Sequence, residues 1–285
     1  MLSKHSTTLT VILIVICPML FMDQPAQSQA DVNAARKFDE FGDIEYSDKI
    51  ARLDNFAIQL QNEPSTRGFI IVYRTRRDLP GLSNRYALWM KNYMVATRGL
   101  SAERVITVDG GVASCLTQEL WIVPVGKTPT PRNDAYNNSF VDTDTARKFD
   151  EHYYALPEES FDGNSYENLA AFLDAFATEL RKESSSSAYI IAYSQYYIER
   201  GFTVDAEGRE KAYKRVHLDP SSTAGKILKT EKNYLVKTYG IAPSRIKVMN
   251  GGYRNLRQVE LWIVPRRADA PVPTPNRFPR RRGRN

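Results

Sequence analysis

The stretch Glu119-Leu120-Trp121-Ile122-Val123-Pro124 occurs a second time, unchanged, as Glu260-Leu261-Trp262-Ile263-Val264-Pro265. Leu, Trp, Ile and Val suit a pleated, half-buried surface, and proline removes a donor from the strand ladder, so the stretch predicts a strand that closes a unit. We expect both tryptophans to pack in a core. We expect both glutamates at a solvent-facing strand position that occurs twice, rather than as a catalytic pair.

Each of these strands closes a longer repeated unit. The six residues from Ala35 to Glu40 return as Ala146 to Glu151. The helix-spaced apolar residues of 53–60 correspond to 173–180, and the short apolar run 69–73 corresponds to 189–193, which favours an inner strand. A second helix follows in each unit and ends near Gly99 or Gly240. Gly110-Gly111 and Gly251-Gly252 are expected to form the turn before the closing strand.

The order of these elements is β-α-β-α-β-β in each unit, so the predicted fold class is α/β, an α+β sandwich in tandem. The predicted organisation is a signal peptide at 1–30, a first repeat at 31–124, a Pro/polar linker at 125–145, a second repeat at 146–265 with an inserted loop at about 194–222, and an Arg/Pro-rich disordered tail at 266–285.

The first thirty residues fit a secretory signal peptide. Lys4 precedes an apolar run from Leu9 to Met22, which is too short to span a bilayer comfortably, and small residues lead up to a cut after Ala30. The mature chain is therefore expected to be secreted or periplasmic. It keeps one cysteine, Cys115, which cannot form an internal disulfide. Because Leu256 stands at the corresponding place, we expect Cys115 to pack.

The net charge of +6 comes from the tail. From Arg266 onward the chain has seven arginines against one acid, Asp269, which gives +6. The repeats are therefore close to neutral, and no nucleic-acid-binding face is predicted. The tail is expected either to contact anionic envelope polymers or lipid headgroups, a peripheral contact at most, or to act as a disordered solubilising segment.

The pattern of each repeat, from Lys-Phe-Asp to Leu-Trp-Ile-Val, resembles the OmpA-like domain of bacterial envelope proteins. Phe38 to Gly42 is similar to that family's opening strand, and Leu82 to Ala87 is similar to the start of its second helix. The resemblance implies noncovalent binding to peptidoglycan through an Asp and an Arg that hold diaminopimelate. Arg76 and Tyr86 stand at those two places in the first repeat, so the resemblance implies the fold and the compartment without the usual ligand pair.

Two sets of residues are candidates for binding. Three arginines lie at the end of the second strand of the first repeat, and two further residues lie at the start of the next helix. Ligands of α/β sheets commonly bind at the carboxyl ends of strands, and arginine binds carboxylates and phosphates. This ligand-binding set is Arg74, Arg76, Arg77, Arg85 and Tyr86. The alternative is a solvated basic turn. The inserted loop mixes aromatic rings with cations and could grip a glycan or a protein, or could be a plain surface hairpin. Its interaction set is Tyr196, Tyr197, Phe202, Arg209 and Tyr213.

The other chemistry-bearing residues indicate no reaction. His152 and His217 lack metal-ligand spacing and a nucleophile, so we expect ordinary surface or loop histidines, no metal and no cofactor. The predicted function is noncatalytic association with the cell envelope, through peptidoglycan or an anionic glycan. The alternative is a module that binds an envelope protein through the inserted loop. An enzyme is not expected.

Overall fold

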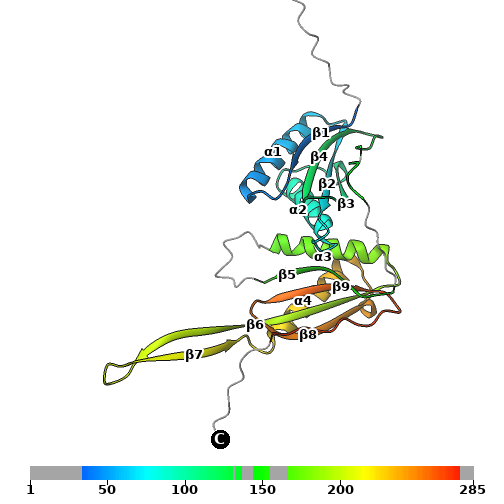
Figure 1. Ribbon diagram of the computed structural model, residues 1–285. Coiled ribbons are helices and arrows are strands. Elements are labelled where there is room, and N and C mark those ends of the chain that lie inside the picture. Colours follow the sequence, from blue (N-terminus) through cyan, green and yellow to red (C-terminus); the bar gives the residue numbers. More distant parts are fainter. Residues whose placement is uncertain (1–33, 131, 137–143, 155–165, 277–285) are drawn as a thin grey trace, which may run out of the picture. The chain divides into compact units, whose positions relative to one another are not determined.

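The computed structural model describes residues 34–130, 132–136, 144–154 and 166–276, and Ala34–Asn285 belongs to one compact unit. Residues 1–30, predicted to be the signal peptide, and residues 277–285 of the predicted tail lie outside this description. The described chain is a mixed α/β structure with four α-helices and two sheets (Figure 1). No helix in the described ranges is long and apolar enough to cross a membrane.

The predicted order of elements is found in the first repeat, and the second repeat has the same order with one additional strand, β7 (Glu210–Leu218). The first repeat contains β1 (Arg36–Phe41), α1 (Tyr46–Asn62), β2 (Thr66–Arg74), α2 (Leu82–Ala96), β3 (Val105–Val112) and β4 (Thr117–Pro124). The second contains β5 (Arg147–Tyr153), α3 (Tyr166–Lys182), β6 (Ser187–Val204), β7 (Glu210–Leu218), α4 (Thr223–Tyr239), β8 (Ile246–Arg254) and β9 (Gln258–Val264).

The repeated closing strand is central in each sheet. The first sheet has the order β1-β4-β2-β3, with β4 antiparallel to both of its neighbours and β2 parallel to β3. The second has the order β5-β9-β6-β7, and β8 pairs with β6 in parallel. A strand with two partners is buried on both faces more fully than an edge strand, which explains its near-continuous run of bulky residues.

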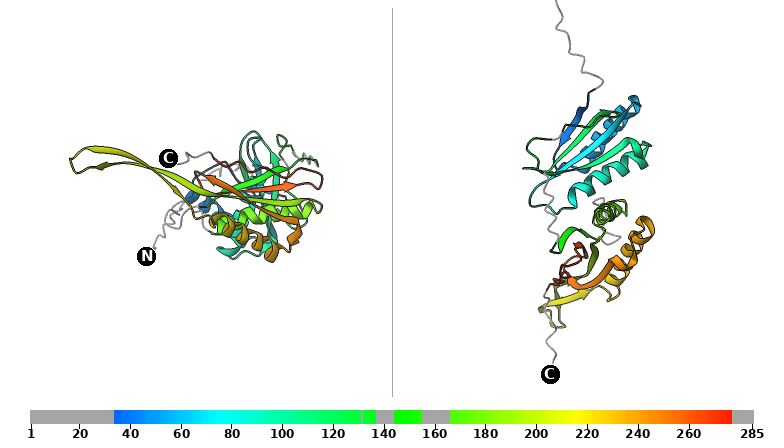
Figure 2. Two further views of the ribbon diagram at one scale, coloured as in Figure 1. Left: turned by 90° about the horizontal axis from the view of Figure 1, so that it is seen from below. Right: turned by 90° about the vertical axis from the view of Figure 1, so that its right-hand side faces the viewer.

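Both helices of each repeat lie on one face of its sheet (Figure 2). In α1 the predicted stripe is fully buried: Leu53, Phe56, Ala57 and Leu60. It packs on Ile70 and Val72 of β2 and on Leu120 and Ile122 of β4. Burial of each large apolar side chain contributes about 1.5–3 kcal/mol, so this stripe fixes the helix on the sheet.

The double glycines lie within β3 and β8, not in the turns before the closing strands. A Cβ at Gly110 would lie 2.5 Å from the ring of Tyr73, and Gly111 has φ +84°, beside a register shift in β2. Gly251 and Tyr193 repeat this close approach. The glycines therefore admit a tyrosine ring against a bulged strand, and the turn prediction is wrong.

The segment after each closing strand ends against the sheet face that has no helices, through Arg132 and Ala135 in the first repeat and through Thr274 and Pro275 in the second. We call these the covering segments: residues 125–130 with 132–136, and residues 266–276. Tyr136 pairs with Val112 through two backbone hydrogen bonds of 3.0 and 3.1 Å. In the second segment the Asn276 amide donates to the Tyr253 carbonyl at 2.9 Å. These residues, predicted as linker and disordered tail, are structural parts of their repeats.

The two packing predictions near the first closing strand have different outcomes. Trp121 packs as predicted, partly buried against a small core cluster of Ile71, Tyr73 and Ala113 on the face away from the helices. Cys115 is exposed in the turn between β3 and β4 and so does not pack. The error for Cys115 arose because the apolar counterpart Leu256, on which the prediction rested, is itself 48% exposed.

Candidate functional site

The arginines after β2 do not gather around one ligand. Arg74 is 8% exposed, and its Nε has no hydrogen-bond partner in the described structure. Arg76 stacks on the ring of Tyr136, 5.1 Å from its centroid, and donates to its hydroxyl. Arg77 is exposed in a turn that Asp78 closes by accepting hydrogen bonds from the Thr75 amide and hydroxyl, both at 2.7 Å. Within the described residues, Arg74 and Arg77 are therefore the two arginines of this set whose side chains have no hydrogen bond or ion pair.

Arg85 binds within the protein instead of joining these arginines. Its Nε donates to the Asp150 carboxylate at 2.8 Å, and its guanidinium lies 4.1 Å from the ring centre of Phe172. Nearby, the Gly81 amide donates to the Phe149 carbonyl at 2.8 Å. Burial raises the pKa of Asp150 even though Arg85 opposes the shift. The helix start that the prediction assigned to a ligand is thus taken up by residues of the second repeat.

Tyr86, the last member of the predicted set, is partly buried against the first core. The Lys49 ammonium lies 4.8 Å from its ring centre, and burial raises the pKa of its hydroxyl. The ring therefore serves packing and a cation contact. Of the five predicted residues, Arg74 and Arg77 have no side-chain partner among the described residues and Arg76 stacks on Tyr136. Arg85 and Tyr86 make contacts within the protein.

A different group of polar atoms marks the same end of the first sheet. Within the described residues, Arg74 Nε, Ser83 Oγ and Gln118 Oε1 are buried without a hydrogen-bond partner. Gln118 pairs in register with Val72, directly before the strand end, and its Nε2 donates to the Gly42 carbonyl at 2.7 Å. Buried polar groups are nearly always paired in folded proteins, so each of these three atoms calls for a partner such as a bound water, an ion or a ligand group.

The second repeat has buried polar groups at the corresponding place. His152 of β5 and Glu231 of α4 are 3% and 0% exposed, and His152 Nε2 lies 2.9 Å from Glu231 Oε1. The Tyr154 hydroxyl donates to the same oxygen at 2.7 Å, while His152 Nδ1 and Glu231 Oε2 have no partner among the described residues. The prediction of a surface or loop histidine is therefore wrong for His152.

Comparison of the two repeats gives the sequence signal that was missed. By alignment, Phe41 and Met90, both buried, occupy the places of His152 and Glu231. In the opposite direction, the places of Arg74, Ser83 and Gln118 are taken in the second repeat by Ser194, Ala224 and Val259, which are also buried. Each repeat thus buries its own polar groups near the same end of its sheet, at places that are not equivalent by alignment.

The repeated glutamates are buried and structural, contrary to the prediction that they face solvent. Glu119 is 0% and Glu260 is 3% exposed. Glu260 accepts from Tyr193, Lys148, Arg254 and Trp262 at 3.0–3.2 Å. Burial alone would raise the pKa of Glu260, but Trp262, Lys148 and Arg254 together hold it below its ordinary value.

The same cluster in the first repeat explains how a covering segment is held. Glu119 accepts from Lys37 at 2.7 Å and from the Trp121 indole at 2.9 Å. Arg132 of the covering segment reaches Glu119 at 3.6 Å and lies 5.4 Å from the ring centre of Tyr73. Burial, with help from Glu119, raises the pKa of Tyr73 to about 12. In the second repeat, Arg254 takes this place and bonds to Thr274.

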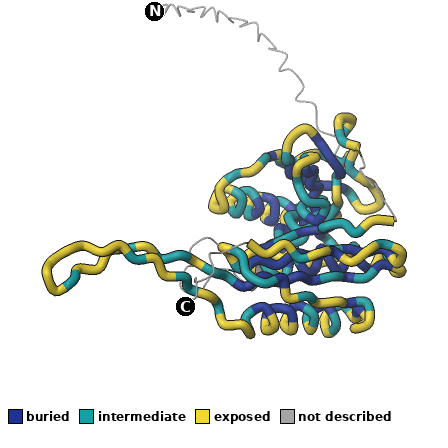
Figure 3. Tube along the Cα trace, turned by 60° about the horizontal axis from the view of Figure 1, so that its bottom comes forward, coloured by how far each residue is buried: buried dark blue, intermediate teal, exposed yellow. Residues whose placement is uncertain are grey.

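The inserted loop of the second repeat is a long hairpin, here called the arm: Tyr196–Val204 of β6 and Glu210–Leu218 of β7. Its nine cross-strand pairs extend beyond the last residue that β6 pairs with β8 or β9 (Figure 1). The burial view shows it mostly exposed (Figure 3). The predicted interaction residues are separated: Tyr197 and Tyr213 lie on one face, Tyr196 and Phe202 on the other, and Arg209 in the turn.

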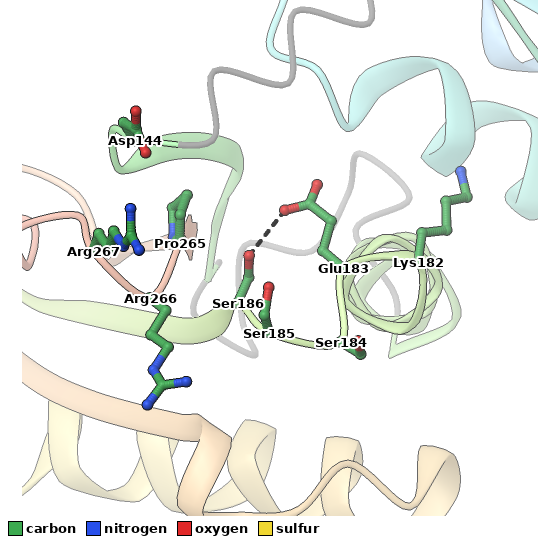
Figure 4. Close-up of a pocket in the computed structure, with 9 residues that line it drawn as sticks. All are labelled: Asp144, Lys182, Glu183, Ser184, Ser185, Ser186, Pro265, Arg266 and Arg267. Atoms are coloured by element: carbon green, nitrogen blue, oxygen red, sulfur yellow. Dashed lines mark hydrogen bonds between the residues drawn. The ribbon is translucent and has the colours of Figure 1, made fainter.

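An open pocket of about 890 Å³ lies at the opposite end of the second sheet (Figure 4). Its lining mixes charges of both signs, and Ser186 donates to Glu183 at 3.0 Å. The lining residues are Asp144, Lys182, Glu183, Ser184, Ser185, Ser186, Pro265, Arg266 and Arg267. With Glu183 also paired to Arg147, this pocket offers no single charge sign to a ligand.

No protein-family model and no curated protein matches this chain. In the ranges that the structure describes, no three His, Cys, Asp or Glu side chains form a metal-binding group. The buried unpaired polar groups and the arm are therefore the features of the described structure that bear on function.

Proposed function

We propose that this is a noncatalytic secreted or periplasmic protein that associates with the bacterial cell envelope through two degenerate OmpA-like repeats. The observation that carries the proposal is that both repeats bury unpaired polar atoms near the same end of the sheet: Gln118 pairs with Val72 near the carboxyl end of β2, and His152 pairs with Val259 at the matching place in the second repeat. Crevices at the carboxyl ends of strands are the common ligand sites of open α/β sheets.

The first repeat suits an anionic ligand. Arg74 is nearly buried with a free Nε, and Arg77 is exposed three residues later. A guanidinium held in a low-dielectric setting binds a carboxylate by charge-assisted hydrogen bonds. Carboxylates occur in peptidoglycan stem peptides and in anionic glycans, which are the two polymer classes proposed here. The element order and sheet order of both repeats support the OmpA-like part of the proposal.

The test is co-sedimentation with purified peptidoglycan sacculi. We expect Arg74→Ser, which introduces the residue of the second repeat, to raise the Kd for sacculi about tenfold, equivalent to about 1.4 kcal/mol. Arg67→Ser is the matched control, because Arg67 is exposed on the same strand. Both variants are also tested without residues 277–285 and at low and high salt. Equal binding by Arg74→Ser and the control would contradict a site at Arg74.

A second function, protein recognition by the arm, is favoured by its exposed apolar side chains. Phe202 is 70% and Val204 is 65% exposed. Large apolar side chains that stand together in solvent mark interaction sites. This function does not depend on sacculus binding, and deletion of the arm should leave sacculus binding unchanged.

A further inference from the structure

The two faces of the arm differ in chemistry. On one face, Glu199 accepts from the Tyr213 hydroxyl at 2.7 Å and contacts His217 Nε2 at 2.6 Å. His217 stacks on Tyr197 with ring centres 4.5 Å apart, and Arg215 lies 3.7 Å from Glu199. The hydrogen bonds from Tyr213 and His217 hold the pKa of Glu199 below its ordinary value. This face is satisfied by its own contacts.

The other face is apolar and lies open. Cross-strand pairing puts Tyr196 opposite Leu218, Ile198 opposite Val216, and Phe202 opposite Ala212. Leu218 is 48% exposed, so solvent reaches the face near its base as well as near its turn. Two-stranded hairpins are at best marginally stable in water, and an uncovered apolar face gives such a hairpin no core. A partner that covers this face would supply the missing burial.

One pair of cations interrupts the apolar face. Arg200 lies directly opposite Lys214, between the Ile198–Val216 and Phe202–Ala212 pairs. Like charges opposite each other destabilise a hairpin, and neither cation has an acidic partner in the part of the chain that is described. The arrangement weakens the free arm and favours a carboxylate brought in from outside, which would neutralise both charges at once.

The positions of the charges select among possible partners. A second copy stacked face to face about a two-fold axis at the middle of the arm would put Arg200 and Lys214 against their own duplicates. An anionic lipid surface would meet Glu210, which lies on this face opposite Val204, whereas Asp205 and Glu207 of the turn are paired with Arg209. An apolar protein surface with an acidic centre meets neither repulsion.

We propose that the apolar face of the arm docks another protein through an apolar strip with an Asp or Glu side chain opposite Arg200 and Lys214. The inference deepens the second proposed function and is independent of the first. It names the chemistry of the partner: apolar residues at alternate positions, as on one face of a strand, with a carboxylate near the centre of the strip.

The experiment is an NMR titration of the full mature protein with two synthetic nine-residue peptides, Val-Thr-Val-Thr-Glu-Thr-Val-Thr-Val and the same peptide with a central Lys. We expect the Glu peptide to bind about tenfold more tightly than the Lys peptide and to shift the amides of Phe202 and Ala212. The double variant Arg200→Glu/Lys214→Glu should reverse the preference. Phe202→Ser should weaken binding of both peptides.

The matched control is Lys211→Glu/Arg215→Glu, which makes the same charge change on the other face and should keep the preference for the Glu peptide. Equal binding of the two peptides, or binding of neither, would overturn the proposal. So would a wild-type dimer that Phe202→Ser dissociates, which would make a second copy the occupant. Binding to phosphatidylglycerol vesicles that Phe202→Ser abolishes would equally overturn it in favour of lipid.

Discussion

At the scale of single residues, the decisive quantity is whether a buried charge has a partner. Among the described residues, Arg85 and Asp150 form the most enclosed Arg–Asp pair, with side chains 18% and 2% exposed. Asp39, the counterpart of Asp150, pairs with Arg52 at a more open site, 41% and 22% exposed. The two equivalent aspartates therefore contribute differently to stability, because Asp150 is removed from water and Asp39 is not.

We predict that Arg85→Leu lowers the free energy of unfolding by about 3–5 kcal/mol, because it leaves the Asp150 carboxylate buried without its cation. Asp150→Asn should change it by less than about 1 kcal/mol, since burial outweighs Arg85 in setting the pKa of Asp150. Urea unfolding measures both. Arg52→Leu is the control and should cost at most about 1 kcal/mol. A larger loss in Asp150→Asn than in Arg85→Leu would refute this account.

Residue-level prediction from sequence succeeded for apolar positions and failed for polar ones. The helix stripe of α1 was read correctly because spacing alone reports the buried face of a helix. The burial of Glu119, Glu260 and His152 could not be read this way. Their partners come from remote elements, and a lone polar residue in a strand gives no sign of how many donors surround it.

At the scale of elements, the covering segments change what counts as a complete repeat. The second covering segment holds Arg254 through Thr274, and its Thr274 amide donates to the Tyr193 hydroxyl at 3.1 Å. Composition predicted an open chain here, since Pro-rich segments seldom bury enough surface to fold alone. The prediction failed because the segment packs on a sheet that is already formed.

We predict that truncation after Pro265 destabilises the second repeat by about 3–5 kcal/mol, from three or more lost hydrogen bonds at about 1 kcal/mol each and from newly exposed aromatic surface. Truncation after Asn276 keeps the covering segment and should leave stability unchanged. Urea unfolding and limited proteolysis distinguish the two proteins. If both truncations unfold at the wild-type midpoint, the covering segment contributes nothing to the fold.

At the scale of the whole molecule, stability is predicted to fall in acid. Hydrogen bonding with Arg36 lowers the pKa of Glu63, and the cations around Glu260 and Asp219 keep the pKa of each below its ordinary value despite burial. A carboxyl with a lowered folded pKa stabilises the fold above its unfolded pKa and loses that contribution as pH falls through the folded value. Asp150 has a raised pKa, so its contribution to stability increases in acid. The other three carboxyls, Glu63, Asp219 and Glu260, lose their contributions there.

The expected result is a urea midpoint that is constant near neutral pH and declines below the ordinary Glu pKa of 4.5. Glu260→Gln should be less stable at neutral pH and should decline less steeply in acid, because it no longer has this proton to take up. A Glu260→Gln protein with the same acid slope as the wild type would show that Glu260 does not contribute to the decline.

The order of the elements was predictable because the sequence contains two copies of the same unit, and each copy could be checked against the other. Agreement between the repeats fixed the number and order of elements, and the difference between them located the arm. The unpaired buried groups required structure, since Arg74, Ser83 and Gln118 lie on three separate elements, β2, α2 and β4, and their burial follows only from the assembled repeat.

The covering segments also set an order of events during synthesis. A ribosome or export channel releases the chain from its N-terminus, and the first sheet cannot gain Arg132 or the Tyr136 pairing until residue 136 has emerged. The second sheet waits in the same way for Thr274 and Asn276. Each repeat therefore passes through an interval in which its closing strand is in place while one side of the sheet is still bare. A chaperone or protease that acts on nascent chains would meet the protein in that interval.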